Sequence, residues 1–456
     1  LSGGQIGEAY PMLLMAAEST LRSGANRPTV KLLEKAERAR ATATGQHDVV
    51  QPGYDRRLHA LWGNVHHRMG KYRQSLDSWG SSLEAARREG EPESVARAQA
   101  GMGLARVAMG DVVAASSALE QALSQLPQGD PMWSQAAEAL AESRLGRGDV
   151  EGSQRLWSEL LELGQEMGAG AIVARAMVGL GEIALGQDRL TQGRDSLENA
   201  VFRMREQSRP RDLPSALLRL AEFTHAEGRL EAARILALEA ESVARDLPLL
   251  PACVAALGLV ARCLYDIGVP HEARMIAQDA ATMARTLGPV ESDMAIGCVL
   301  PAARVLVALG AVDDASAILP ATPPSADGCA GLVDPVGGLL AVKSRIVFER
   351  NPTVAVALAG QVLARPPAAL TWVAVRHLID AAETLVLAGD ERGREAITSA
   401  LSLVAGTGLT LLEMEAGLLA AKLGMDPAIG DQAKRSLDAI EHQLGSPEGF
   451  RVRWLG

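Results

Sequence analysis

The amino-acid sequence predicts an all-α fold, a right-handed superhelical solenoid of about 10–11 antiparallel helix hairpins. Three observations predict it. A turn motif recurs about every 40 residues, a small residue lies seven positions before each turn, and no stretch shows the sustained alternation of β-branched residues typical of a strand. Because 48% of the residues are hydrophobic but only 3% are aromatic, the core must consist of Ala, Leu, Val and Met, which suits close helix pairs.

One hairpin, residues 97–127, shows the design. We expect a first helix that ends at Met109 and a second helix over 112–126, with a Gly-Asp dipeptide turning the chain between them. Pro127 ends the second helix, because proline cannot continue one. The other units repeat this pattern.

A small residue near the middle of each first helix lets the second helix approach closely. Glycine at position 103 costs about 1 kcal/mol relative to alanine, and we expect close contact with Ala115 and Ala122 to offset it. The predicted turns fall at Gly70-Lys71, Gly110-Asp111, Gly148-Asp149, Asp188-Arg189, Gly228-Arg229, Gly268-Val269, Gly310-Ala311, Asn351-Pro352, Gly389-Asp390 and Gly424-Met425. The corresponding small positions are Gly63, Gly103, Ala141, Gly181, Ala221, Ala261, Ala303, Ser344, Ala382 and Gly417.

Each second helix has its own recurring pair, a small residue followed four positions later by a bulkier or apolar one. The pairs are Ser75 and Trp79, Ala115 and Leu119, Ser153 and Trp157, Gly193 and Leu197, Ala233 and Ala237, Ala273 and Ala277, and Ala315 and Leu319. Prolines that cannot continue a helix close many units, at Pro92, Pro127, Pro210, Pro248, Pro289, Pro320 and Pro366.

These features resemble the tetratricopeptide repeat family over about residues 12–444. The large-small pairs that carry the resemblance are Trp62-Gly63, Met102-Gly103, Leu140-Ala141, Leu180-Gly181 and Leu220-Ala221, together with the Gly-Asp or Gly-Lys turns and the closing prolines. The period is nearer 40 than 34 residues, and His66, Arg106 or Leu264 replaces the aromatic residue expected three positions after the small one. The sequence is similar to long-helix members of the family in large bacterial regulators.

The pattern is irregular in three places. The first hairpin, over 12–22 and 27–42, is atypical. Residues 319–337 are rich in proline and glycine, so the second helix of that unit must be short, and the segment is expected to be a surface loop or a hinge. We therefore divide the chain into a repeat array over 1–318, this interruption, and continuing repeats with a C-terminal cap over 338–456. In the tail, Phe450 and Trp454 are expected either to fold back as that cap or to lead into further chain.

Composition excludes several classes of protein. A net charge of −10 argues against a nucleic-acid partner, which would require a basic face. No charge-free apolar run is long enough for a membrane span, and the N-terminus lacks the layout of a signal peptide. The cysteines Cys253, Cys263, Cys298 and Cys329 are expected to be free thiols in a reducing cytoplasm. The chain begins with Leu1 rather than Met, as expected of a fragment or processed piece.

No motif indicates catalysis. The opening LSGGQ matches the ABC-transporter signature, but no phosphate-binding G-x-x-x-x-G-K-[ST] accompanies it. His59 and His66 are seven residues apart, about 10 Å along a helix, which is too far for one metal ion. No G-x-S-x-G elbow occurs. We therefore expect no catalytic residue, no metal site and no cofactor.

The residue just after each small position is a candidate for binding, because the resemblance places it on the concave groove. In order, these residues are Asn64, Leu104, Glu142, Glu182, Glu222, Arg262, Arg304, Arg345, Glu383 and Leu418. Neighbouring candidates on the same face are His67, Arg68, His225, Tyr265, Asp266, Phe348 and Glu349. Three glutamates followed by three arginines predict either a charge-polarised groove or a ladder of paired or solvated charges.

The leading functional hypothesis is a non-enzymatic, cytoplasmic scaffold that binds a protein or peptide in its groove. The alternative is a sensory or autoinhibitory C-terminal region of a larger bacterial signalling protein, joined to a Ser/Thr kinase, a nucleotide cyclase or a STAND-type ATPase or transcriptional regulator. Neither nucleic acid nor membrane is an expected partner, and the sequence leaves the oligomeric state open.

Overall fold

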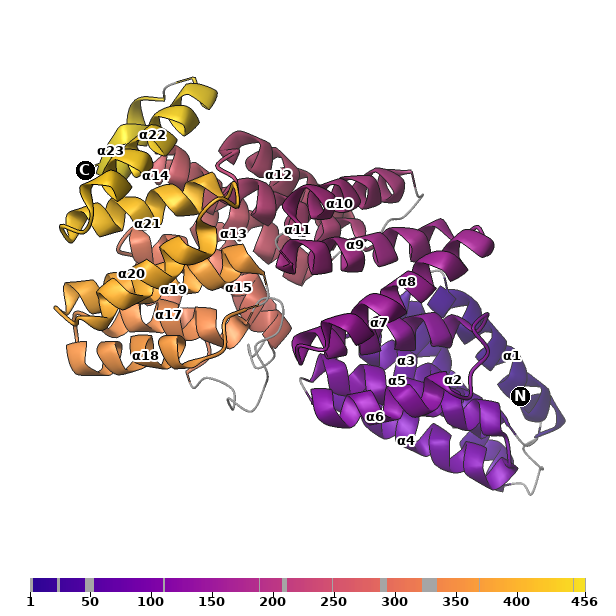
Figure 1. Cartoon of the computed structure of the whole chain (residues 1–456). Coiled ribbons are helices and arrows are strands. Elements are labelled where there is room, and N and C mark those ends of the chain that lie inside the picture. Colours follow the sequence, from indigo (N-terminus) through magenta and orange to yellow (C-terminus); the bar gives the residue numbers. More distant parts are fainter. Residues whose placement is uncertain are drawn as a thin grey trace. The chain divides into compact units, whose positions relative to one another are not determined.

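The computed structural model describes residues 3–22, 25–45, 53–109, 111–187, 189–206, 211–247, 249–287, 293–321, 334–368, 370–445 and 447–455. The chain divides into two compact units, which are described separately. Unit 1 comprises Leu1–Arg144 and Glu151–Leu163, and unit 2 comprises Leu145–Val150 and Gly164–Gly456. Throughout the described residues the regular elements are helices, which pack as successive hairpins (Figure 1), so the predicted all-α solenoid of antiparallel helix hairpins is confirmed.

The first eight helices belong wholly or mainly to unit 1. They are α1 (Gly3–Arg22), α2 (Asn26–Gly45), α3 (Tyr54–Arg68), α4 (Tyr72–Glu89), α5 (Pro92–Ala108), α6 (Val112–Leu123), α7 (Pro131–Gly146) and α8 (Val150–Glu166). The following helices are α9 (Gly170–Gly186), α10 (Leu190–Arg205), α11 (Leu213–Ala226), α12 (Leu230–Asp246), α13 (Leu250–Ile267), α14 (Pro270–Ala284), the 3₁₀ helix η1 (Arg285–Leu287), α15 (Asp293–Ala308) and α16 (Val312–Ala317). The chain continues with α17 (Pro335–Val347), α18 (Pro352–Ala364), α19 (Thr371–Leu387), α20 (Arg392–Val404), α21 (Thr410–Lys422), α22 (Pro427–Gln443) and α23 (Glu448–Leu455).

Two helix boundaries differ from the prediction. Helix α6 ends at Leu123 rather than at 126, because the backbone N–H of Leu126 bonds to the carbonyl of Ala122 at 2.9 Å and the chain continues as a turn up to the proline. Helix α1 begins well before residue 12. Packing supports this extension, since Tyr10 is buried and its ring meets that of Tyr54 edge to face at 5.9 Å.

The ten small positions of the first helices are all buried. At Gly103 a Cβ atom would lie 2.6 Å from Cγ of Leu119, and at Gly63 it would lie 2.7 Å from the ring of Trp79. The small residue of each first helix therefore packs against the small-bulky pair of its second helix. Gly101 also packs against Trp79, with only 2.1 Å between its hypothetical Cβ and the indole.

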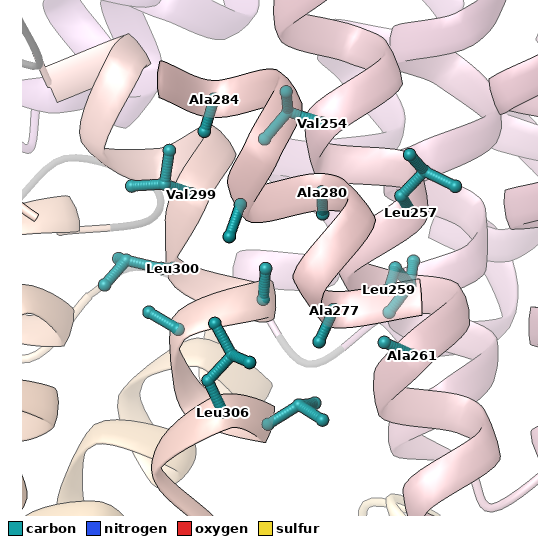
Figure 2. Close-up of a cluster of buried hydrophobic side chains, with 14 of the residues drawn as sticks. Val254, Leu257, Leu259, Ala261, Ala277, Ala280, Ala284, Val299, Leu300 and Leu306 are labelled. Carbon is teal, nitrogen blue, oxygen red and sulfur yellow. The ribbon is translucent and has the colours of Figure 1, made fainter. Parts of the chain in front are cut away.

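The largest core of unit 2 consists mainly of alanine, valine and leucine side chains. Figure 2 shows part of it, with Val254, Leu257, Leu259 and Ala261 from α13, Ala277, Ala280 and Ala284 from α14, and Val299, Leu300 and Leu306 from α15. Helix α13 is long and apolar enough to cross a membrane, but 61% of it is buried among its neighbours. Its apolar character is therefore that of a core helix.

The later hairpins of unit 2 pack against the first helices of the earlier ones. Helix α21 contacts α11, and α23 contacts α13. One buried cluster joins Phe223 of α11 to Trp372 of α19 and Leu412 of α21. As a result, α19, α21 and α23 cover part of the face that α11 and α13 would otherwise present.

The irregular segments are only partly described. Helix α16 has six residues, as expected from the proline and glycine residues that follow it. Residues 322–333, with Cys329, lie outside the described residues, so the division of the chain at 319–337 stays a prediction. Gly110, Asp188, Pro210, Pro248 and Pro289 also lie outside the described residues. Cys253, Cys263 and Cys298 are free thiols.

Candidate functional site

In unit 1, three candidate groove residues make contacts within their own unit. The Asn64 amide donates to the carbonyl of Ala60 at 3.1 Å, and the Arg68 guanidinium donates to the carbonyl of Leu21. The ring of His67 lies edge-on to Tyr72, with centroids 5.4 Å apart. Glu142 is the exposed candidate of this unit.

In unit 2, the first two acidic candidates share one arginine. Arg219 lies on α11 and donates from Nε to Oε1 of Glu182 at 2.5 Å and from Nη1 to Oε2 of Glu222 at 2.8 Å. Because Arg219 and Glu222 are three residues apart on one helix, they lie on the same helix face. The pairs therefore link α9 to α11.

Helix α13 contributes a second group of charges. Nε of Arg262 donates to Oδ2 of Asp266 at 2.6 Å, and the same oxygen lies 2.9 Å from Nε2 of His225 on α11. Nη2 of Arg262 lies 3.6 Å from a carboxylate oxygen of Glu415 on α21. Glu415 also pairs with Arg376 of α19 at 2.6 Å, so this group spans four helices.

The next two arginines pair with carboxylates of α19. Nε of Arg304 on α15 donates to Oδ2 of Asp380 at 2.8 Å. Nη1 of Arg345 on α17 lies 3.4 Å from Oε2 of Glu383. Each charged candidate that directly follows a small position, from Glu182 to Glu383, is thus in an ion pair. We call these residues and their partners the inner charge network, comprising Glu182, Arg219, Glu222, His225, Arg262, Asp266, Arg304, Arg345, Arg376, Asp380, Glu383 and Glu415.

The remaining candidates lie at the edges of this network. Tyr265 lies beneath the guanidinium of Arg453 on α23, 4.2 Å from Cζ to the ring centroid. Phe348 is half-buried at the C-cap of α17, and Glu349 is exposed. On α23, Phe450 and Trp454 are buried, and the Trp454 indole donates to the carbonyl of Asp266 at 3.0 Å.

Burial and neighbouring charges act against each other in the network. Burial disfavours the charge on Arg262, but the carboxylates of Asp266 and Glu415 raise its pKa above its ordinary value. Burial likewise disfavours the Asp266 carboxylate, yet Arg262 and His225 hold the pKa of that carboxyl well below its usual range. Burial lowers the pKa of Arg304 and raises the pKa of Glu383. Arg262 and Asp266 are therefore a true ion pair, whereas burial lowers the pKa of His225 and favours its neutral form. Burial likewise favours the neutral form of Glu383.

Hydrogen-bond donors outnumber acceptors in the network. Among the described residues, Nη2 of Arg262, Nη2 of Arg304 and Nη1 of Arg376 are buried without a hydrogen-bond partner. On the acidic side, Oδ1 of Asp266 is in the same condition, whereas Oε2 of Glu415 lies 2.6 Å from Nη2 of Arg376. Buried polar groups are normally satisfied, so this interior has spare capacity to bind acceptors.

Two shallow pockets lie elsewhere in unit 2. One, of about 480 Å³, runs between α10 and α12 beside the exposed side chains of Phe202 and Ile235. The other, of about 270 Å³, is lined by His377 and by the buried pair of Asp334 and Arg365. Asp334 has a φ of 33°, a left-handed conformation that costs a non-glycine residue about 1–3 kcal/mol.

Sequence reasoning missed one third of the inner charge network, namely Arg219, Arg376, Asp380 and Glu415. The partners Arg219, Asp380 and Glu415 each lie two positions before a small residue, at Ala221, Ala382 and Gly417. That position is three residues before the candidate groove position and so lies on the same helix face. A charge there, in an otherwise apolar helix, is the signal that would have identified these residues.

Comparison with known proteins agrees with the helical repeats. The tetratricopeptide repeat family matches residues 56–128. Among curated proteins, none matches the chain. Three solved structures have a similar fold. Aspartyl phosphate phosphatase F from Bacillus subtilis is 12% identical, with 90% of this chain and 96% of that chain covered and a TM-score of 0.45. The apo quorum sensor NprR from B. thuringiensis is 10% identical, with coverage of 87% and 99% and a TM-score of 0.47.

The third structure is the human IFIT1 dimer with m7Gppp-AAAA, which is 14% identical, with coverage of 88% and 90% and a TM-score of 0.44. At such identities the likeness concerns the helical arrangement alone. The family match covers α3 to α6, and the same pattern of buried small residues continues in the later hairpins. The chain therefore contains a tetratricopeptide-repeat region over residues 56–128, and its later hairpins are similar to that region in their buried small residues.

Proposed function

We propose that this protein is a non-enzymatic scaffold that binds a protein or peptide through the inner faces of its hairpins. The inner charge network is the observation that carries the proposal. It contains the charged side chain that directly follows the small position of each first helix of unit 2, from Glu182 on α9 to Glu383 on α19, which supports a binding face common to these helices. Charges in such positions set the orientation and the encounter rate of a partner more than its affinity.

The proposal assigns partner segments of opposite charge to different parts of the groove. Within unit 2, Glu182 and Glu222 would meet a basic stretch of the partner, and the arginines of α13, α15 and α17 would meet an acidic one. Within unit 1, Glu142 would by itself meet a basic residue. Glu182 and Glu222 share Arg219, so their substitution also disturbs an ion pair. Glu142 is exposed on α7 and is the position at which the acidic part is tested in unit 1.

The test is a binding screen of the full chain against arrays of basic, acidic and neutral peptides. Binders are then measured by fluorescence anisotropy. Glu142→Lys is expected to weaken a basic ligand, whereas the matched control Glu159→Lys, on an exposed position of second helix α8, leaves the affinity unchanged. Unaltered binding by Glu142→Lys would refute its place in the groove, and failure of every peptide class to bind would refute peptide binding itself.

One observation favours the alternative, a sensory or autoinhibitory region of a larger signalling protein. Helices α19, α21 and α23 pack against α11 and α13, as an autoinhibitory contact within a larger protein would require. Immunoblotting of source-cell lysate with peptide mapping decides between the two proposals. A band near 48 kDa supports a free-standing scaffold, and a much larger band with kinase, cyclase or ATPase peptides supports the alternative.

A cytoplasmic location, and partners other than nucleic acid or membrane, belong to the same proposal. The net charge of −10 supports the exclusion of nucleic acid, because a polyanion is repelled by an acidic surface. Binding or turnover of ATP by the purified chain would contradict the non-enzymatic part of the proposal.

A further inference from the structure

We infer that the inner face of α13, α15 and α17 binds an acidic, extended segment of a partner protein, and that carboxylates of α19 and α21 occupy its place as an internal substitute. This inference rests on the proposed function and names the chemistry of the partner. It follows from how three arginines are arranged, which residues they pair with, and which of their donors are left over.

The three arginines form a regular row. Arg262, Arg304 and Arg345 each follow the small residue of their helix, and α13 packs against α15 as α15 packs against α17. Neighbouring helices lie about 8–10 Å apart. A row of this spacing matches an extended chain that has an acidic residue at every third position, since each residue spans about 3.3 Å.

The partners of Arg304 and Arg345 come from the later hairpins of unit 2, whereas Arg262 pairs with Asp266 of its own helix and also lies near Glu415 of a later hairpin. Asp380 and Glu383 lie one turn apart on α19 and pair with Arg304 and Arg345, and Glu415 of α21 lies beside Arg262. The later hairpins therefore present three carboxylates to three arginines of the earlier ones. An acidic peptide that replaced them would have to present three carboxylates at the same spacing.

The carboxylates of α19 and α21 leave some N–H donors of the arginines without a hydrogen bond. Nη2 of Arg262 and Nη2 of Arg304 are buried without a hydrogen-bond partner, and Glu415 is shared between Arg262 and Arg376. Each guanidinium offers a planar fork that matches a carboxylate through two parallel bonds. A ligand whose carboxylates approach the fork in this way would make bonds that the internal pairs do not make.

Exchange of one carboxylate for another also keeps the number of ion pairs constant. The arginines are already desolvated in the closed arrangement, so ligand binding does not incur their desolvation free energy a second time. A basic or neutral segment cannot take part in this exchange, because it would leave the arginines unpaired. The geometry therefore selects an acidic partner.

The test uses a fluorescent nonapeptide with glutamate at positions 2, 5 and 8 and glycine or serine elsewhere, together with its glutamine analogue. The full chain is compared with Glu383→Gln, which removes one internal competitor. Glu383 and Arg345 are 39% and 29% exposed at the side chain, so this variant is expected to fold. The matched control is Glu239→Gln, which breaks the exposed pair with Arg205 on α10 and α12.

Glu383→Gln is expected to bind the glutamate peptide at least threefold more tightly than the unaltered chain, and Glu239→Gln to bind it equally. Arg304→Gln is expected to weaken binding at least tenfold. Because that variant removes a partner of a buried carboxylate, its folding is checked by circular dichroism, and Arg345→Gln replaces it if it does not fold. The glutamine analogue is expected to bind none of these proteins measurably.

Equal binding of the two peptides would overturn the inference, and so would a Glu383→Gln affinity no higher than that of the unaltered chain. Either result leaves the proposed function intact if basic or neutral peptides bind. A failure of all three classes of peptide would instead overturn the proposed function together with this inference.

Discussion

The ring of Trp372 in α19 meets the ring of Phe223 in α11 edge to face, with centroids 5.5 Å apart. Both side chains are buried in one cluster with Leu412 of α21. This contact connects the earlier and later hairpins of unit 2 through apolar packing, beside the ion pairs of the inner charge network. Hydrophobic burial rather than charge is therefore the main source of free energy for the closed arrangement, since buried ion pairs gain little after their desolvation.

Replacement of this ring should destabilise unit 2 strongly. Phe223→Ala removes a fully buried side chain and leaves a cavity beside Trp372, and such substitutions typically cost about 3–5 kcal/mol of unfolding free energy. Urea unfolding followed by circular dichroism measures the loss. The control is Phe202→Ala on α10, where the ring is 61% exposed and a change within about 0.5 kcal/mol is expected. Equal effects of the two substitutions would show that α11 and α19 do not pack in this way.

The close packing of the first-helix glycines against the second helices leads to a second prediction. Gly103→Ala places a Cβ 2.6 Å from Cγ of Leu119, so the two helices of the hairpin must separate, at a typical cost of about 1–3 kcal/mol. Gly80 lies inside α4 with no atom within 4 Å of its hypothetical Cβ. There the same change is expected to stabilise the protein by about 0.5–1 kcal/mol, the ordinary gain of alanine over glycine in a helix.

Thermal or urea unfolding of the two variants checks the sign of each change. A neutral Gly103→Ala would mean that the close contact in this hairpin is absent. The larger Gly103→Leu and Gly181→Leu extend the test, and damage is expected in neighbouring hairpins first, because each repeat contacts mainly its neighbours.

The hairpins were predictable from sequence because their determinants are local. A turn glycine, a closing proline and a small residue such as Ala261 act within one repeat, and each recurs in the sequence at a fixed spacing. Even the boundary error at the end of α6 is local, since a turn bonded to Ala122 replaces the last helical residues.

The closure of unit 2 was not predictable in this way. Arg262 reaches Glu415 and Trp454 reaches Asp266 across many repeats. These contacts depend on the rotation that accumulates from one repeat to the next. The sequence of a single repeat does not determine that summed rotation. The sequence identified the arginine row itself and left open a ladder of paired charges. It could not show that the partners of the row come from α19 and α21.

His377 should make the stability of unit 2 depend on pH. It is buried on α19 beside Arg304, Asp334, Asp380 and Arg365, and burial lowers its pKa to about 4 from an ordinary 6.5. Between these values the unfolded chain binds more protons than the folded one, so stability falls as the pH decreases. The expected loss from this group between pH 7.5 and pH 5 is about 2 kcal/mol.

Because Asp266, Glu415 and His225 also have shifted pKa values, the measurement is a difference between variants. Urea midpoints of the unaltered chain and of His377→Gln are compared at both pH values. The variant is expected to lose less stability on acidification. His271→Gln, at an exposed position of α14, is the control and should follow the unaltered chain. Parallel pH dependence in all three proteins would contradict a neutral, buried His377.

The attachment of α23 depends on two glycines whose backbones touch. A Cβ at Gly449 would lie 1.9 Å from the carbonyl oxygen of Gly268, which ends α13 with a left-handed φ of 96°. Gly449→Ala must therefore push α23 away from α13 and expose Phe450 and Trp454. We expect a loss of about 1–3 kcal/mol, together with binding of a hydrophobic dye. Val452→Ala is the matched control, because Val452 lies on the same helix and is 72% exposed. If Gly449→Ala bound no more dye than Val452→Ala, α23 would not be held by this contact.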